Sequence, residues 1–236
     1  WEMEPGMLHE NDAALRLCRL AEGPGCTHSP DIKEGKIELT AATDGCFTVR
    51  SEALLAVNSV PQVMVATRKG NTAVRAGDKL AGMRVIPLVI DGAVLDGADA
   101  AAAAAPGEGP LCEVVPFKLR RVGIVTTGSE VAGGLIEDSF TPVVQAKLAA
   151  FGIEMVAHEL PGDDTDDIVA AIGRVREAGV DLVVCTGGMS VDPDDNTPGA
   201  IQRSGAEMVT YGAPVLPGAM LFVGYYEDGT PVLGLP

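Results

Sequence analysis

The second half of the chain repeats one pattern, a short apolar run that ends in polar or glycine residues and leads into a stretch with helix signals. The three apolar runs are RRVGIVTTG (residues 120–128), IEMVAHEL (153–160) and VDLVVCTGG (180–188). Short apolar runs of this kind are typical of strands in buried parallel sheets. The strand–helix alternation predicts an open, largely parallel sheet with helices on both faces.

Each apolar run is followed by a predicted helix. FTPVVQAKLAAFG (140–152) has Thr141 as the expected N-cap, Pro142 at the first helical position and Gly152 as the stop. TPGAIQRSG (197–205) repeats the same Thr-Pro start. We therefore expect both helices to begin directly after a capping threonine.

The remaining segments of this half also have clear signals. GDDTDDIVAAIGRVREAG (162–179) opens with acids and closes with two arginines and a glycine, which suits the dipole of a helix at both ends. MLFVGYYEDGTPVLGLP (220–236) predicts a hairpin that turns at Asp228-Gly229. The expected N-cap and first-turn residues of the 162–179 helix are Asp164, Asp166 and Asp167.

The first half predicts a smaller, β-rich, mixed α/β region. NDAALRLCRLAEG (11–23) reads as a helix with Asn11 or Asp12 as its N-cap, and residues 36–57 read as strand, Asp-Gly turn, strand and a helix of about two turns. The alanine-rich segment 97–110 predicts a short helix ended by proline and glycine, or a plain linker. The expected domains are 1–112, the N-terminal region, and 113–236, the α/β domain.

Charge and hydropathy exclude several partners. Asp and Glu number 33 and Lys and Arg 17, so the net charge is −16, which repels phosphate backbones and argues against nucleic acid. The chain has no run of about 18 apolar residues, so we expect no membrane span.

The five cysteines of the chain are an odd number without a CxxC pair, which favours reduced thiols and a cytoplasmic location. Cys26 and His28 could hold a metal, but no matching second pair follows, so the preferred interpretation is loop residues.

Two of the predicted strands end in glycine-rich turns that carry hydroxyl groups, TTGSE (126–130) and TGGMS (186–190). In open α/β sheets, ligands bind at the carboxyl ends of strands. Glycine lets a backbone approach a ligand, and backbone N–H groups can bind an anion. Either loop alone could be a plain tight turn, but two such loops on one sheet indicate a binding site with amides directed at an anionic ligand.

Acidic residues gather after the second loop, in SVDPDDN (190–196). Carboxylates this close repel one another, and a hard cation such as Mg²⁺ would relieve the repulsion and help an acidic cleft to hold a phosphate. The segment does not match a calcium-binding loop. For the other acids that follow strand ends, the alternative to a role in a binding site is a helix cap or a turn. The acids of both kinds are Glu130, Asp138, Asp163, Asp164, Asp192, Asp194 and Asp195.

Five ordered segments in residues 120–236 resemble the molybdopterin-binding domain: GIVTTGSEV, DSFTPVVQAKLAAFG, PGDD, DLVVCTGGMSVDPDDNTPGAI and PGAMLFVGY with PVLGLP. That domain is shared by molybdopterin adenylyltransferases, molybdopterin molybdotransferases and CinA-like proteins. The resemblance implies a three-layer α/β/α sandwich, and this fold agrees with the alternation of strands and helices predicted above. It also implies molybdopterin as cofactor, with Mg²⁺ and molybdate as further expectations, and a homo-oligomer with a molybdoenzyme or a cofactor-pathway protein as partner.

The resemblance also assigns roles to residues. Asp192 and Asp195 are expected to be catalytic and to hold the metal. Gly234-Leu235-Pro236 is expected to help close the pocket. The residues expected to bind the cofactor are Thr126, Thr127, Gly128, Ser129, Glu130, Asp138, Thr186, Gly187, Gly188, Ser190, Pro217 and Gly218.

Departures from the family patterns leave three functions open. Ser129 stands where molybdotransferases carry an acid in TGDE, Ala219 stands where their PGKP has lysine, and Asp192-Pro193-Asp194 replaces a Gly-acid pair. The adenylyltransferase pattern TGGTG is also missing. The alternatives are a divergent Mg²⁺-dependent molybdotransferase, a pterin-binding or sensor module without catalysis, and a CinA-like hydrolase of a nucleotide pyrophosphate.

Overall fold

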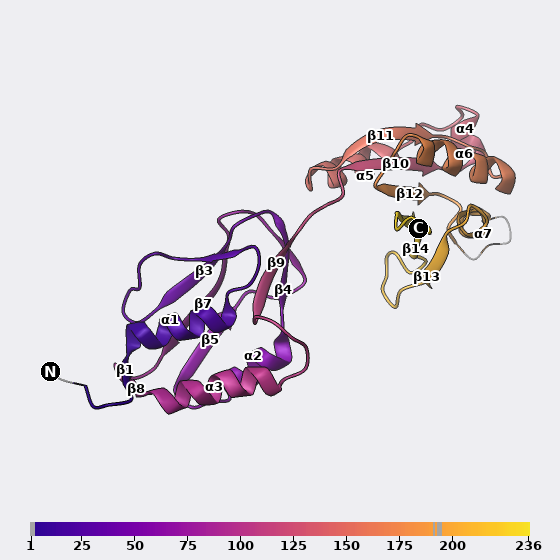
Figure 1. The fold of residues 1–236 in the computed structure, drawn as a ribbon. Helices are drawn as coiled ribbons and strands as arrows, with labels where there is room; N and C mark the ends of the chain where they lie inside the picture. Colours follow the sequence, from indigo (N-terminus) through magenta and orange to yellow (C-terminus); the bar gives the residue numbers. More distant parts are fainter. Residues whose placement is uncertain (1–2, 191, 193–194) are drawn as a thin grey trace. The chain divides into compact units, whose positions relative to one another are not determined.

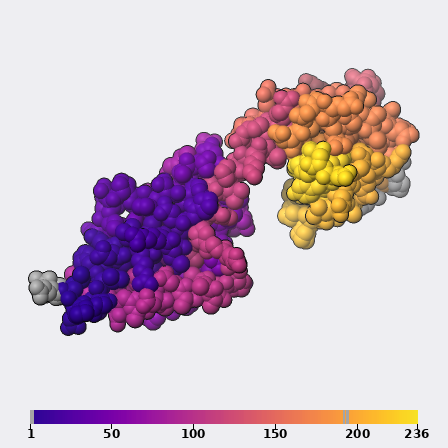
Figure 2. Space-filling view, in the orientation of Figure 1, coloured from indigo at the N-terminus to yellow at the C-terminus, as the bar shows by residue number. Residues whose placement is uncertain are grey.

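The computed structural model describes residues 3–190, 192 and 195–236. The chain divides into two compact units, one that ends at Phe117 and one that spans Lys118–Pro236 (Figure 1). Each unit buries its own apolar core, and in the space-filling view each is a continuous mass of packed side chains (Figure 2).

The first unit combines small antiparallel sheets with helices. Strands pair in the orders β1-β8, β2-β3-β7-β5 and β6-β4-β9. Its elements are β1 (Met7–His9), α1 (Glu10–Ala21), β2 (Cys26–His28), β3 (Ile37–Ala41), β4 (Gly45–Val49), α2 (Ser51–Asn58), β5 (Val63–Thr67), β6 (Thr72–Val74), β7 (Lys79–Val85), β8 (Val89–Asp91), α3 (Gly92–Ala104) and β9 (Cys112–Pro116).

Two details of this unit differ from what the sequence predicts. The predicted caps Asn11 and Asp12 are wrong, because α1 begins earlier and the ring Nδ1 of His9 accepts a hydrogen bond from the Asn11 amide at 3.2 Å. The two strands on either side of the Asp-Gly turn, β3 and β4, belong to different sheets. The turn therefore carries the chain from one sheet to another.

The second unit is a six-stranded sheet in the order β11-β10-β12-β15-β14-β13. Neighbours from β11 to β15 pair in parallel, and β14 pairs antiparallel with both β15 and β13. Its elements are β10 (Arg121–Thr126), α4 (Ser129–Ala132), α5 (Phe140–Ala149), β11 (Glu154–Glu159), α6 (Thr165–Glu177), β12 (Leu182–Thr186), α7 (Thr197–Arg203), β13 (Glu207–Tyr211), β14 (Phe222–Tyr225) and β15 (Pro231–Leu235).

Helices cover both faces of this sheet, so the unit is a three-layer α/β/α sandwich. On one face Val122 and Ile124 of β10 pack with Val144 and Leu148 of α5. On the other face the apolar residues of α6 and α7 pack with alternate residues of β10 and β12. The mostly parallel sandwich predicted from the sequence is confirmed.

Three of the sequence predictions concern helix starts and a hairpin turn in this unit. The side chain of Asp164 caps α6 by accepting from the amides of Asp166 and Asp167, as predicted. The hairpin β14–β15 is also confirmed. The prediction that Thr141 caps the next helix is wrong, because α5 begins at Phe140.

The two Thr-Pro sequences in fact place each threonine inside the first helical turn. Thr141 is the second residue of α5 and Thr197 is the first residue of α7. Both threonines are buried, at 4% and 0% exposure. Their hydroxyl groups therefore bond to the sheet instead of capping a helix.

The described residues form no helix that is both long and apolar enough to cross a bilayer. All five cysteines are free thiols.

Candidate functional site

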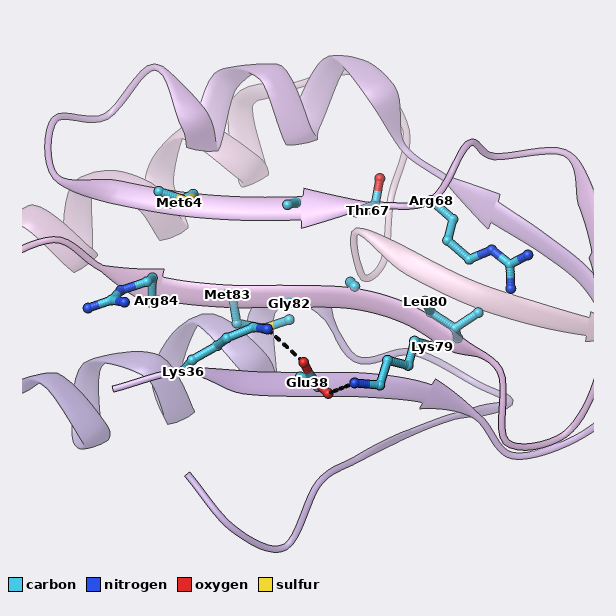
Figure 3. A pocket seen from close by; sticks show the side chains of 12 residues that line it. Lys36, Glu38, Met64, Thr67, Arg68, Lys79, Leu80, Gly82, Met83 and Arg84 are labelled. Carbon is cyan, nitrogen blue, oxygen red and sulfur yellow. Dashed lines mark hydrogen bonds and ion pairs between the residues drawn. The ribbon is translucent and has the colours of Figure 1, made fainter. Parts of the chain in front are cut away.

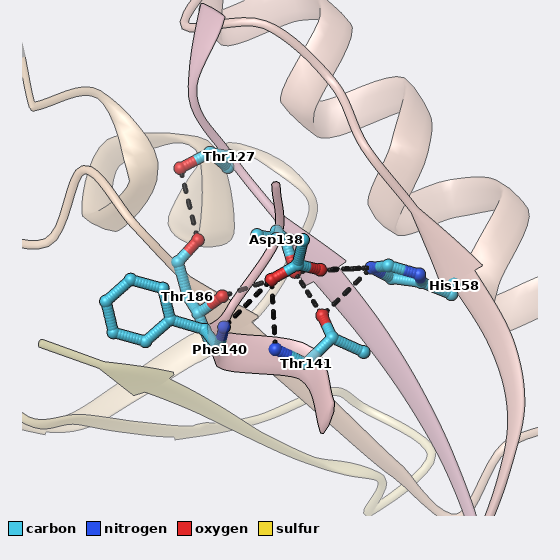
Figure 4. Close-up of polar contacts among 7 residues, drawn as sticks. Thr127, Asp138, Phe140, Thr141, His158 and Thr186 are labelled. Carbon is cyan, nitrogen blue, oxygen red and sulfur yellow. Dashed lines mark hydrogen bonds and ion pairs between the residues drawn. The ribbon is translucent and has the colours of Figure 1, made fainter. Parts of the chain in front are cut away.

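The two glycine-rich loops lie side by side at the carboxyl ends of β10 and β12. The parallel register places Thr126 opposite Thr186. The next residue, Thr127, donates its amide to the Thr186 carbonyl at 2.8 Å and its hydroxyl to the same oxygen at 3.2 Å (Figure 4). Residues 126–130 and 186–190 are thus neighbours on one rim of the sheet.

Two glycines permit this close approach. Gly187 has φ +84° and Gly188 has φ +53°, in the left-handed region that side chains disfavour. A Cβ at Gly187 would overlap the carbonyl oxygen of Thr127, and a Cβ at Gly188 would lie 2.9 Å from the hydroxyl of Thr197. These glycines are required by the packing of the loops, independent of any ligand.

Hydrogen bonds between threonine hydroxyls connect the carboxyl ends of β10 and β12 to each other and to the starts of α5 and α7. Thr126 bonds Thr141 at 2.8 Å, and Thr186 bonds Thr126 at 3.3 Å. On the other side Thr127 bonds Thr197 at 3.0 Å. The hydroxyls of Thr126, Thr127 and Thr186, which the sequence reading assigned to the cofactor, are therefore bonded within the protein and buried, at 2–5% exposure.

Asp138 joins the start of α5 to these threonine hydroxyls (Figure 4). Its carboxylate accepts from the amides of Phe140 and Thr141, each at 3.0 Å, and lies 3.5 Å from Nε2 of His158. Burial opposes ionisation of the group, but hydrogen bonds from Thr141 and from the Phe140 amide outweigh it, so the pKa of Asp138 lies below its usual value. The amides bond Oδ1, whereas Oδ2 is the oxygen that lies near His158, and it is buried and accepts no hydrogen bond from the described residues.

The amides of the first loop are occupied by the protein itself. The Gly128 amide donates to the carbonyl of Pro161 at 3.3 Å, and the Ser129 amide donates to the Asp163 carboxylate at 2.9 Å. With Thr127 bonded to Thr186, three consecutive amides are engaged. The expectation that both loops keep free amides is wrong for residues 127–129, because the sheet continues through Thr127 and Asp163 caps the short helix that follows.

The second loop differs. Within the described part of the chain, the amides of Gly188, Met189 and Ser190 donate to no acceptor. The carbonyls of Met189 and Ser190 accept from the hydroxyl of Tyr211, at 3.0 and 3.3 Å. Burial, and then the charge of Asp195, raise the pKa of Tyr211, so this hydroxyl stays a donor. The hydroxyl of Tyr211 thus holds the carbonyls of this loop, while no described residue accepts from the amides of Gly188, Met189 and Ser190.

The acidic residues do not all gather at this loop. A Cβ at Gly188 would lie 3.7 Å from Oδ1 of Asp195, so this carboxylate borders the loop. Asp192 is exposed, and its carbonyl accepts from the Asp195 amide at 3.0 Å. Asp194, expected in the same cluster, lies outside the described residues. Asp192 and Asp195 are not part of any group of three close ligating side chains among the described residues.

The remaining predicted site residues come from other parts of the second unit. Pro217 and Gly218 are in the connection between β13 and β14, where the Gly218 carbonyl accepts from the Leu221 amide at 3.3 Å. Glu130 is exposed in α4. At the carboxyl end of β15, Leu235 pairs with Thr186 and a Cβ at Gly234 would overlap Met189. The GLP segment therefore borders the second loop.

Asp163 is among the acids that follow strand ends in the sequence, but its bond to the Ser129 amide is not predicted there. Sequence reasoning missed three other residues that build the site: Tyr211, which holds the second loop, and the two helix threonines, Thr141 and Thr197. The repeated Thr-Pro pattern is the signal for the two threonines, although the same pattern also suits a helix cap. For Tyr211 the sequence offers no signal, because β13 comes to the loop through the order of strands in the sheet.

A separate hollow of about 380 Å³ lies on the four-stranded sheet of the first unit (Figure 3). Its floor contains Gly82 and Ala66, which pair across β7 and β5 and have little or no side chain. Glu38 bonds Lys36 at 2.6 Å and Lys79 at 2.8 Å, and these bonds lower its pKa to about 2.

The other two lining cations have acidic partners as well, since Arg68 is 3.1 Å from Asp78 and Arg84 is 3.9 Å from Glu10. The cations of this hollow are thus paired already. In that respect it differs from the second loop of the sandwich, whose amides at Gly188, Met189 and Ser190 find no acceptor among the residues that the structure describes.

The second unit is an α/β/α domain whose two glycine-rich loops lie at the carboxyl ends of neighbouring parallel strands, the edge at which ligands bind in sheets of this kind. Residues 123–236 match the family model described as "Probable molybdopterin binding domain". The second unit therefore belongs to the molybdopterin-binding domain family.

Curated relatives match over a shorter stretch. A CinA-like protein of Mycobacterium avium is 37% identical over 90 residues, which are 38% of this chain and 21% of that protein. A CinA-like protein of Mycobacterium tuberculosis is 38% identical over 90 residues, again 38% and 21%. The matched stretch thus spans about a fifth of the length of these relatives.

Solved structures give similar matches. The molybdopterin biosynthesis enzyme MoaB from Thermus thermophilus is 25% identical, with 50% of this chain and 81% of that chain covered and a TM-score of 0.44. The molybdopterin biosynthesis MoeA protein from Pyrococcus horikoshii is 17% identical, with 97% and 74% covered and a TM-score of 0.43.

Proposed function

We propose that the second unit binds molybdopterin, or its adenylated form, in the synthesis or handling of molybdenum cofactor. The observation that carries this proposal is the second loop, whose amides at Gly188, Met189 and Ser190 have no acceptor in the described part of the chain and lie beside the carboxylate of Asp195. Membership of the molybdopterin-binding domain family supports the choice of ligand.

The chemistry of the loop fits a pterin that carries a phosphate. Unengaged backbone amides bind phosphate oxygens without a cationic side chain. The N–H groups of a pterin ring need acceptors, and carboxylates such as Asp195 supply them. Because residues 186–197 contain no lysine or arginine, the phosphate would lie close to several acids. Mg²⁺ bound by Asp192 and Asp195 would offset that repulsion.

Molybdenum transfer is the catalytic form of this proposal. In that form Mg²⁺ would polarise the pyrophosphate of the adenylated pterin, while the loop amides hold the phosphate in position. Ala219 in place of the family lysine favours the simpler alternative, a pterin-binding module without turnover. The similarity to CinA-like proteins favours a third reaction, hydrolysis of a nucleotide pyrophosphate.

One set of incubations separates these functions. The purified chain is mixed with adenylated molybdopterin, Mg²⁺ and molybdate, and in parallel with ADP-ribose and Mg²⁺. Release of AMP with cofactor formation supports transfer, tight binding without turnover supports the module, and cleavage of ADP-ribose supports the hydrolase. Absence of both binding and turnover with molybdopterin and its adenylated form would contradict the proposal.

A substitution locates the site. Asp195→Asn should weaken binding of the adenylated pterin at least about tenfold in the presence of Mg²⁺, as expected for loss of a charged contact. Glu154→Gln is the matched control, because Glu154 is an exposed carboxylate at the amino end of β11. Equal affinity in the two variants, measured by calorimetry, would remove Asp195 from the site.

A further inference from the structure

Three metal-ligating side chains from helix α1, its C-cap and strand β2 meet in the first unit. Cys18 and Glu22 are four residues apart, so they share one face of the helix end, where the Glu22 amide still bonds the Cys18 carbonyl at 2.7 Å. Nδ1 of His28 lies 2.7 Å from Oε2 of Glu22, and Sγ of Cys18 lies 3.9 Å from the same oxygen. The three ligating atoms are all within 4.8 Å of one another.

The fold thereby supplies the second pair that the sequence lacked. From the sequence, His28 had only Cys26 as a neighbouring ligand. In the structure the cluster around His28 consists of Cys18 and Glu22, and Cys26 is not part of it.

The spacing of these atoms is close to that of a tetrahedral metal site. Metal–ligand distances of about 2.0–2.3 Å imply separations of about 3.3–3.7 Å between ligating atoms. The His28–Glu22 distance is shorter than this range and the Cys18–Glu22 distance slightly longer. Rotation of exposed side chains corrects both, because Glu22 and His28 are 25% and 42% exposed.

The donor set selects the class of metal. One thiolate, one imidazole and one carboxylate suit Zn²⁺ and related transition metals, whereas Mg²⁺ and Ca²⁺ prefer oxygen ligands alone. We propose that Cys18, Glu22 and His28 bind one Zn²⁺-class ion, with solvent at the fourth position. On binding, the Cys18 thiol gives its proton to solvent and forms the metal–sulfur bond, and the hydrogen bond between His28 and Glu22 is replaced by two metal–ligand bonds.

The open fourth position follows from where the ligands lie. Cys18 is fully buried, while His28 and Glu22 reach solvent, so an ion held by all three would sit at the surface of the unit. Sites with three protein ligands and one solvent ligand leave a position that a substrate or a partner group can take. This proposal concerns the first unit and does not depend on the pterin site.

Cobalt titration of the full chain tests the proposal. The protein is freed of metal with a chelator and titrated with Co²⁺, and we expect one equivalent to give a thiolate-to-cobalt charge-transfer band in the near ultraviolet. Zn²⁺ should then displace Co²⁺ and remove the band. Carboxylates elsewhere in the chain cannot produce this band, which separates the site from weak binding by surface acids.

Variants assign the ligands. Cys18→Ala should abolish the charge-transfer band, and His28→Gln should weaken Co²⁺ binding at least about tenfold, since even residues that support a ligand change affinity by about 10–100-fold. Cys46→Ser is the matched control, because Cys46 is a free thiol on β4 outside the cluster. Circular dichroism confirms that each variant is folded.

A second readout covers a variant that fails to fold. Zn²⁺ should raise the Tm of the native chain and of Cys46→Ser but not that of His28→Gln, whose altered side chain is on the surface. The proposal is overturned if Co²⁺ gives no charge-transfer band, or if Cys18→Ala and His28→Gln bind it as the native chain does.

Discussion

The two glycine-rich loops of the sandwich have similar sequences, TTGSE and TGGMS, and follow neighbouring strands, yet their backbones differ in what they bond. In the first loop the amides of Thr127, Gly128 and Ser129 all donate to protein oxygens. In the second loop the carbonyls are held by Tyr211 and the amides of Gly188–Ser190 have no acceptor among the described residues. A loop whose donors are satisfied can position its neighbour, whereas a loop with unsatisfied donors can bind an anion.

This contrast gives the two loops distinct roles. The first loop holds the ends of β10 and β12 together, and the second is the loop that we propose as the ligand-binding surface. Sequence similarity between the loops hides this difference, because the partners of the first loop come from elsewhere, from β12 and from the segment Pro161–Asp163.

The largest effect is expected at Gly187. In Gly187→Ala the new Cβ would overlap the Thr127 carbonyl at φ +84°, so the two strand ends must separate, at a cost of about 3 kcal/mol in unfolding free energy. Gly179→Ala is the control, because Gly179 has φ +72° and open space around it, so only the backbone cost of about 1 kcal/mol applies. Denaturant unfolding followed by circular dichroism measures both, and equal losses would show that the loops are not packed as described.

The next effect concerns the hydroxyl of Thr127. Thr127→Val removes its bonds to the Thr186 carbonyl and to Thr197 while keeping its shape, and should cost about 1–2 kcal/mol. Combined with Thr197→Val in a double-mutant cycle, it should show a coupling of about 1 kcal/mol, as residues in direct contact do. Strict additivity of the two losses would mean that this bond contributes nothing.

A smaller, pH-dependent effect is expected at Asp138. Its pKa lies below the usual value in the folded protein, so the ionised carboxylate stabilises the fold above its ordinary pKa, and that stability is lost as the pH falls through the folded pKa. Asp138→Asn should therefore be less stable than the native chain at neutral pH, by under about 1 kcal/mol. The difference should shrink in acid, and a difference that is constant with pH would rule out the charge as its cause.

The smallest effect is expected at Asp163. Because this carboxylate is exposed, losing its bond to the Ser129 amide in Asp163→Ala should cost about 0.5 kcal/mol. The same variant should speed hydrogen exchange at Ser129. Asp192→Ala, an exposed acid with no side-chain hydrogen bond among the described residues, should change neither quantity.

The sequence was sufficient for the sandwich because its signals are local. Apolar runs, the Asp164 cap and the Asp228-Gly229 turn each depend on residues close in the chain, and each is found as predicted. The site was predicted only in outline. That Thr127 would lie beside Thr186 follows from strand ends in a parallel sheet, but which amides stay free depends on residues far apart in sequence.

The helix starts that contain Thr141 and Thr197 show why such contacts cannot be predicted from residues close in the sequence. A threonine before proline suits a helix cap, and nothing nearby distinguishes that role from a buried hydroxyl. Thr141 and Thr197 instead bond Thr126 and Thr127 because the sheet brings each helix start against a strand end. The cluster of Cys18, Glu22 and His28 is a similar case in the first unit, since its parts meet only when β2 packs beside α1.

Hydrogen exchange at single amides, measured by NMR with and without molybdopterin, tests the central contrast most directly. The account predicts fast exchange at Gly188 and Ser190 in the free chain and slowing of both on binding. It predicts slow exchange at Thr127 and Ser129 in both states. Slow exchange at Gly188 and Ser190 without ligand, or ligand protection confined to Thr127 and Ser129, would contradict it.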